Sequence, residues 1–67
     1  MEQNWAKIYT SSDFFKSEMV RQALVENGID AVIMNKQGFP YNIGEVEVYI
    51  NQDFLQEAQE IIIKNEL

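Results

Sequence analysis

The chain contains no cysteine and no histidine among its 67 residues. Without cysteine it has no disulfide framework, no thiol nucleophile and no thiolate ligand for a metal ion. Without histidine it also lacks the commonest general base and the commonest side-chain ligand of metals. These two absences remove the usual tools of most enzyme classes. We therefore expect a protein that is not an enzyme and that holds neither a cofactor nor a metal ion.

Positive charge is scarce as well, with 5 Lys and Arg residues against 11 Asp and Glu residues and a formal net charge of -6. An acidic chain repels the phosphates of nucleic acids and the anionic surfaces of membranes. No apolar run approaches the roughly 18 residues of a transmembrane helix, and the first residues lack the basic and apolar segments of a signal peptide. We expect a cytoplasmic protein that binds neither nucleic acid nor membrane.

The few glycines and the single proline divide the chain into short segments. Gly28 directly precedes Ile29, an arrangement typical of a helix end at which glycine takes a left-handed conformation. The two other glycines and the proline fall within residues 36–44, which predicts a turn longer than the tightest hairpins. A chain of this length has room for one core, so we expect a single domain over residues 1–67.

Three segments have the composition of β-strands. Residues 45–50 alternate with a period of two, which places both valines and Ile50 on one face. Residues 5–10 alternate in a similar way, and residues 31–35 contain a short apolar run. We expect the last two strands to pair in an antiparallel hairpin.

Two further segments repeat apolar residues at helical spacing. The first helix is expected at residues 13–27. The Ser-Ser-Asp sequence at residues 11–13 is suited to capping this helix. A serine nucleophile at these residues would need a general base, and the chain has no histidine to act as one. The second helix is expected at residues 52–65. Its acidic residues are expected on a solvated face rather than around a metal ion: Asp53, Glu57 and Glu60.

The expected order of elements is strand, helix, strand, strand, helix. Each helix has one apolar stripe, so both should lie on the same face of an antiparallel or mixed three-stranded sheet. A right-handed crossover should place the first strand beside the third and parallel to it, with the second strand on the other side of the third, in the order 1-3-2. This is an α+β, ferredoxin-like βαββα fold without the usual last strand.

The expected core collects apolar residues from the two helical stripes and from one face of the sheet. Its members are Ile8, Phe15, Met19, Ala23, Leu24, Ile29, Val32, Val46, Val48, Ile50, Leu55, Ala58 and Ile62.

The order and spacing of several motifs resemble a family of short bacterial domains described as putative prokaryotic signal-transducing proteins. The motifs are Ile8-Tyr9-Thr10, Asn27-Gly28-Ile29, Ala31-Val32-Ile33 and Val46-Glu47-Val48-Tyr49-Ile50, followed by Asp53 and Ala58. The resemblance spans nearly the whole chain and implies a fold similar to that of the PII (GlnB-like) nitrogen-regulatory proteins, but no established ligand or reaction. The turn at residues 36–44 stands where PII-like proteins carry a long effector loop, yet it is far shorter and lacks a glycine-rich, basic phosphate cradle.

The sheet face away from the helices is the main candidate for binding, because it collects aromatic and charged side chains: Trp5, Lys7, Tyr9, Glu47 and Tyr49. Interfaces between proteins favour aromatic residues, and an acidic chain is poorly suited to stacking nucleic-acid bases. Phe39 and Tyr41 of the 36–44 turn are further candidates for partner contact. The alternative for these two residues, which we favour, is that they fold back and close the end of the core.

These features leave two hypotheses for the function. One is a non-catalytic regulatory module of signal transduction, which binds a protein partner or a second copy of itself through the open edge of the first strand and the aromatic face. The alternative is a small-molecule sensor of the PII or ACT-like kind, with an unidentified ligand at a subunit interface. A sensor should show a polar pocket between subunits and a thermal shift with metabolites, whereas an adaptor should show neither.

We predict no tight binding to nucleic acid at physiological salt, because a net charge of -6 opposes the release of counterions that supplies most non-specific affinity. Fluorescence anisotropy with labelled single-stranded RNA measures this affinity. Micromolar binding that weakens steeply as salt is added would contradict the prediction.

Overall fold

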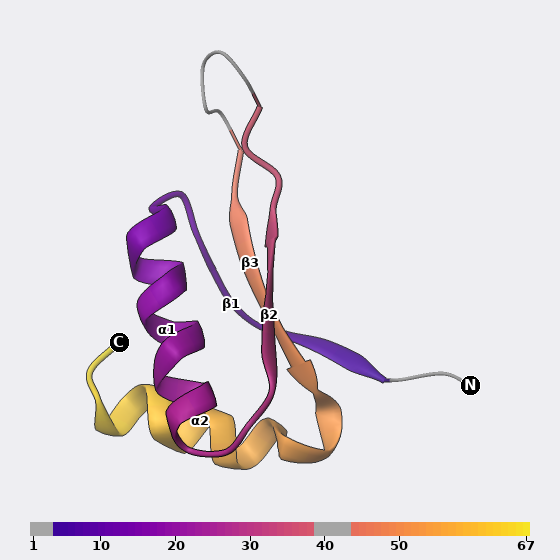
Figure 1. Ribbon diagram of the computed structural model, residues 1–67, viewed down its shortest axis with the longest axis vertical. Coiled ribbons are helices and arrows are strands. Elements are labelled where there is room, and N and C mark those ends of the chain that lie inside the picture. Colours follow the sequence, from indigo (N-terminus) through magenta and orange to yellow (C-terminus); the bar gives the residue numbers. More distant parts are fainter. Residues whose placement is uncertain (1–3, 39–43) are drawn as a thin grey trace.

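The computed structural model describes residues 4–38 and 44–67 (Figure 1). The three strands and two helices predicted from the sequence are confirmed, and the first turn of the second helical segment is a 3-10 helix. The elements are β1 (Trp5–Ser11), α1 (Phe14–Glu26), β2 (Ala31–Asn35), β3 (Val46–Asn51), the 3-10 helix η1 (Gln52–Phe54) and α2 (Leu55–Lys64).

The strands form one antiparallel sheet in the order β1-β3-β2, which confirms the predicted order. The expectation that β1 runs parallel to β3 is wrong. The crossover through α1 makes β1 parallel to β2, and β3 returns between these two strands in the opposite direction. The described elements therefore form the predicted α+β, ferredoxin-like βαββα fold.

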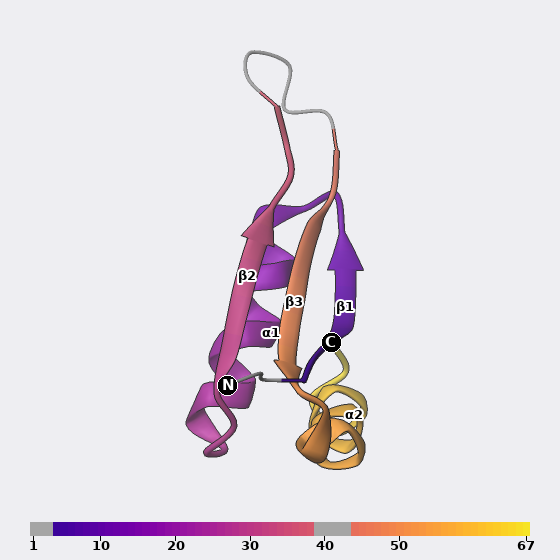
Figure 2. The same ribbon diagram turned by 90° about the vertical axis from the view of Figure 1, so that its right-hand side faces the viewer.

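Both helices pack on the same face of the sheet. α1 lies along this face and contacts all three strands, while α2 crosses below the end of the sheet and contacts α1 and β1 (Figure 1). Figure 2 shows the strands in front of α1, with no described helix over their opposite face. Neither described helix is long and apolar enough to cross a membrane.

Local interactions fix both ends of α1 as the sequence predicts. The Asp13 carboxylate caps the first turn and accepts a hydrogen bond of 2.9 Å from the backbone N–H of Phe15. At the other end Gly28 has a φ of 86°, and the N–H of Ile29 donates to the carbonyl of Leu24 at 2.9 Å. This is the left-handed glycine termination, which turns the chain back toward the core.

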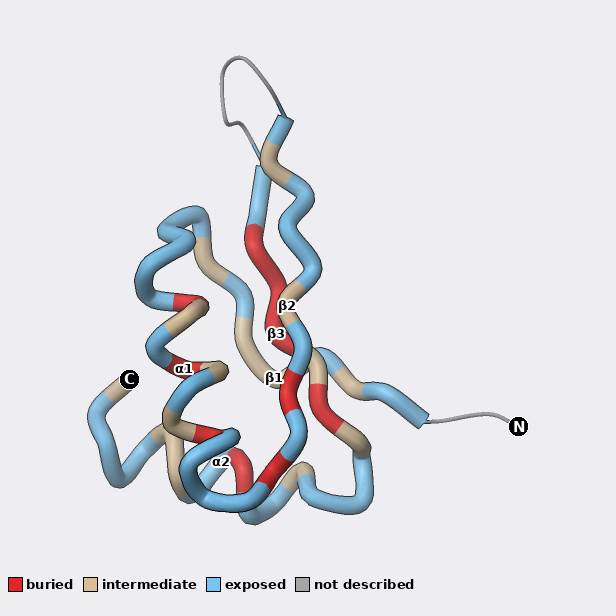
Figure 3. Tube along the Cα trace, viewed as in Figure 1, coloured by how far each residue is buried: buried red, intermediate tan, exposed pale blue. Residues whose placement is uncertain are grey.

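The core lies between the helices and the inner face of the sheet (Figure 3). Its described cluster consists of Val20, Leu24, Ile29, Ala31, Val48, Ile50 and Ala58. Among the predicted core residues, six are confirmed as buried: Leu24, Ile29, Val46, Val48, Ile50 and Ala58. Four others are partly buried: Ile8, Ala23, Leu55 and Ile62.

Two of the predicted core residues on α1 are wrong, since Phe15 is 78% exposed and Met19 is 55% exposed. Apolar residues occur around the whole circumference of α1, so their spacing allows more than one buried stripe. The stripe that faces the sheet consists of Ser17, Val20 and Leu24, which are spaced by three and four residues. A serine takes part in this stripe because its hydroxyl donates to a backbone carbonyl of β3 at 3.4 Å.

Val32 of β2 is also wrongly predicted to be in the core. The register of β2 and β3 pairs Ala31 with Ile50 and Val32 with Tyr49. Opposed residues share a face of the sheet, so Ala31 is buried and Val32 is 45% exposed on the other side. The continuous apolar run of β2 does not indicate which residues point inward, and the pairing with β3 decides it.

A β-bulge interrupts β1 at Ile8. Lys7 pairs with Tyr49, but Tyr9 pairs with Val48. The extra residue turns Tyr9 toward the helices, where both Tyr9 and Ile8 pack against the core. The prediction that Tyr9 lies on the uncovered face is therefore wrong, because a period of two does not continue across a bulge.

The burial of α1 predicts different effects for two alanine substitutions in the same helix. Leu24→Ala deletes a fully buried side chain and should lower the free energy of unfolding by about 2–5 kcal/mol. Phe15→Ala removes a mostly exposed side chain and should change it by less than about 0.5 kcal/mol. Urea denaturation followed by circular dichroism measures both values. Equal losses of stability would show that the buried stripe of α1 is misassigned.

Candidate functional site: the open face of the sheet

The open face is the face of the sheet that no described helix covers. The strand register sets its side chains in rows across β1, β3 and β2. One row contains Lys7, Tyr49 and Val32, and the next contains Thr10, Glu47 and Met34. Trp5 lies at the end of the face, opposite Asn51.

Glu47 forms the polar centre of the open face, and it is only 6% exposed although no helix lies above it. The hydroxyl of Tyr49 donates a hydrogen bond of 2.9 Å to Oε1 of Glu47. The ammonium group of Lys36 lies 3.2 Å from the same oxygen, and that of Lys7 lies 3.4 Å from Oε2. Because β3 lies between β1 and β2, side chains from both sides reach the carboxylate: Lys7 from β1 and Lys36 from the residue after β2.

These three contacts favour the ionised form of Glu47. The hydrogen bond from Tyr49 makes the largest contribution and holds the pKa of Glu47 below its usual value. Desolvation acts in the opposite direction, and the ammonium groups of Lys36 and Lys7 lower the pKa further. The centre of the open face is therefore an ionised carboxylate with its oxygens already occupied by donors.

Apolar side chains lie beside this polar centre on β2 and at the end of the same face on β1. Trp5 is 40% exposed, Val32 is 45% exposed and Met34 is 49% exposed. Trp5 also lines a recess of about 210 Å³ at the end of the sheet, together with Gly28, Asp30, Asn51 and Phe54. Exposed aromatic residues and methionine around a small polar centre are typical of surfaces that bind other proteins.

The structure brings together four of the predicted site residues: Trp5, Lys7, Glu47 and Tyr49. Tyr9 is turned to the other side by the bulge, and Phe39 and Tyr41 lie outside the described residues. The sequence analysis missed three members of the same surface: Val32, Met34 and Lys36. They lie on one face because they alternate along β2 and beyond its end. The apolar run of β2 carries no signal for that face, and only the pairing with β3 assigns it.

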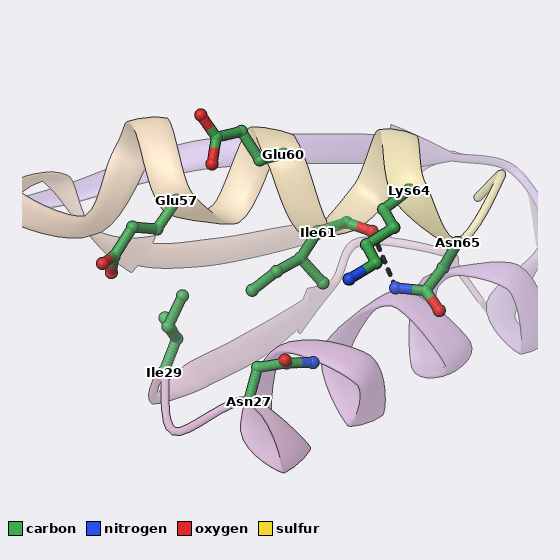
Figure 4. Close-up of a pocket in the computed structure, with 7 residues that line it drawn as sticks. All are labelled: Asn27, Ile29, Glu57, Glu60, Ile61, Lys64 and Asn65. Carbon is green, nitrogen blue, oxygen red and sulfur yellow. Dashed lines mark hydrogen bonds between the residues drawn. The ribbon is translucent and has the colours of Figure 1, made fainter.

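A second concavity, of about 440 Å³, lies between the end of α1 and α2 (Figure 4). It is lined by Asn27, Ile29, Glu57, Glu60, Ile61, Lys64 and Asn65. Figure 4 shows the carboxylates of Glu57 and Glu60 pointing in different directions, and the amide of Asn65 donates to the carbonyl of Ile61 at 2.8 Å.

The two carboxylates of this concavity do not converge on a common point. Within the described residues, no three acidic side chains lie close enough together to hold a metal ion. Every buried side-chain nitrogen and oxygen among the described residues also has a hydrogen-bond partner. The open face is therefore the stronger candidate for a binding site.

A family model described as "Putative prokaryotic signal transducing protein" matches residues 5–66 of the chain. The match runs from β1 through α2 and so includes the strands that form the open face. The description names no ligand, reaction or partner. No curated protein and no solved structure matches the chain.

The lowered pKa of Glu47 predicts a loss of stability in acid. The pKa of a glutamate in the unfolded chain is about 4.3. The contribution of Glu47 to stability is complete above that value and is lost as the pH falls through the lower pKa of the folded state. Urea denaturation at a series of pH values between roughly 2 and 7 should show a smaller acid-induced loss for Glu47→Gln than for the parent.

The matched control is Glu57→Gln, which removes the same charge from an exposed position on α2. This variant should keep the acid-induced loss that the parent shows. An equal loss in the parent and in Glu47→Gln would mean that the Glu47 network does not stabilise the folded state.

Proposed function

Because the chain belongs to the family of putative prokaryotic signal transducing proteins, we propose that it is a non-catalytic regulatory module that binds a protein partner. The contact surface is the open face, together with the adjoining outer edge of β1. One observation carries the proposal: an uncovered sheet face presents Trp5, Val32 and Met34, each at least 40% exposed, around the Glu47 network.

The chemistry of the open face defines the partner that it fits. Burying the exposed apolar side chains against another apolar patch removes them from water, which favours association. The ammonium groups of Lys7 and Lys36 are about half exposed and keep N–H donors free beyond their contacts with Glu47. A fitting partner therefore presents an apolar patch flanked by carbonyl or carboxylate acceptors.

The outer edge of β1 supplies a smaller part of the proposed contact. No described strand pairs with this edge, which borders Trp5 and Lys7 on the open face. The bulge at Ile8 interrupts the regular spacing of its backbone donors and acceptors. A partner strand can pair regularly on one side of the bulge but not across it, so the open face provides most of the contact area.

The absence of catalysis is part of the proposal and has two supports. The sequence contains neither histidine nor cysteine, which are the commonest general base and a common nucleophile. The buried carboxylate of the open face, Glu47, already accepts from Tyr49 and faces two lysines. An ionised carboxylate held in this way has little tendency to take up a proton, as a general base must.

Co-purification from the organism that makes the protein tests the proposed contact. The tagged full chain is compared with Trp5→Ala, which removes the aromatic anchor of the open face, and bound proteins are measured by quantitative mass spectrometry. Loss of an anchor residue typically weakens binding by about 2 kcal/mol, or roughly thirtyfold. We therefore expect a partner that is retained by the parent and lost with Trp5→Ala.

Phe15→Ala is the matched control, because it truncates an aromatic side chain that is 78% exposed on α1, away from the open face. It should retain the partner, and circular dichroism should show that both variants are folded. A partner retained equally by Trp5→Ala would contradict the proposed surface. A rise in melting temperature with a metabolite, without any partner, would favour the small-molecule sensor instead.

A further inference from the structure

The outer edge of β2 is open, because β2 pairs with β3 on one side and with no described strand on the other (Figure 2). Unpaired strand edges offer a row of backbone donors and acceptors to another chain. Proteins commonly protect such edges with a bulge, a proline or a lysine within the strand. β1 has both a bulge and Lys7, whereas β2, with the sequence Ala-Val-Ile-Met-Asn, has none of these.

The hydrogen bonds of the hairpin show which backbone groups of β2 point outward. The N–H of Lys36 donates to the carbonyl of Glu45 at 3.0 Å, in continuation of the register of β2 and β3. Bonding positions alternate along an antiparallel strand. Every second residue counted back from Lys36 therefore bonds to β3, and the residues between them direct their N–H and C=O groups to the open edge: Ala31, Ile33 and Asn35.

We propose that two copies of the chain associate through their β2 strands, which pair antiparallel around a two-fold axis at Ile33. In this register Ile33 pairs with the partner's Ile33, and Ala31 pairs with the partner's Asn35. All of these residues direct their backbone groups outward, so the pairing uses every free group of β2. It joins the two three-stranded sheets into one continuous sheet.

Charge supports this register. Asp30 directly precedes β2 and Lys36 directly follows it, and both residues are exposed. They lie three residues on either side of Ile33, so the two-fold axis sets each Asp30 opposite the partner's Lys36. These are non-hydrogen-bonded positions, at which opposed side chains lie closest together. A parallel pairing in register would set like charges side by side.

The side chains of β2 also complement their own copies. On the open face the same register sets Val32 opposite the partner's Met34, and these residues are 45% and 49% exposed in one chain. Lys36 lies 3.2 Å from Glu47, so in the pair its ammonium group would lie between Glu47 and the partner's Asp30. The contact is self-complementary in backbone pairing, charge and apolar surface, as a two-fold interface requires.

Sedimentation velocity of the full chain tests the pairing with two edge variants. Asp30→Lys replaces the cross-strand ion pair by a repulsion. Asn35→Pro removes an outward N–H while leaving the hydrogen bonds from β2 to β3 in place. The parent should dimerise as its concentration rises, and each edge variant should raise the dissociation constant at least about tenfold.

The matched controls are Asp53→Lys, which makes the same change of charge at an exposed position outside β2, and Asn35→Ala, which keeps the N–H. Both should dimerise like the parent, as should Trp5→Ala, which separates this inference from the proposed partner surface. If circular dichroism shows that Asn35→Pro is unfolded, the dissociation constant of Asp30→Lys alone tests the proposal. A parent that is monomeric up to roughly 1 mM, or edge variants that dimerise as the parent does, would overturn the proposal.

Discussion

The central strand β3 determines which residues lie on each face of the sheet, because it pairs with both β1 and β2. Its alternate residues serve opposite purposes. Val46, Val48 and Ile50 are fully buried under the helices, while Glu47 and Tyr49 lie on the open face. A shift of one residue would exchange these sets and expose the core, so the apolar side of β3 fixes the position of the polar side.

The carboxylate of Glu47 shows how a polar group can be buried on a sheet that no described helix covers. Removing a carboxylate from water is costly unless donors replace the lost hydration. Tyr49, Lys36 and Lys7 supply these donors, and their side chains also shield the carboxylate. The same contacts restrain the long lysine side chains, which lowers the entropy that a binding surface loses when a partner arrives.

The two edges of the sheet differ in ways that suit different contacts. β1 contains a bulge: Ile8 and Tyr9 pack against the core, whereas Lys7 lies on the open face. β2 is regular, short and free of charge within the strand. A domain of this size buries a limited core, so area gained at a regular edge adds stability that the single chain does not have. Trp5 and Lys7 of the open face lie on β1, across β3 from the β2 edge, and stay available when that edge is occupied.

The sequence by itself determined the elements, their order, the caps of α1 and the inner face of β3, because these depend on local periodicity and on turn and capping residues. It also placed Trp5, Lys7, Glu47 and Tyr49 on one surface. Tertiary structure decided what local patterns leave ambiguous. Packing against the sheet selected the stripe of Ser17, Val20 and Leu24 on a helix with apolar residues all round. Pairing with β3 set the faces of β2, and a one-residue bulge in β1 turned Tyr9 into the core, since such a bulge follows from strand pairing rather than from the residues beside it.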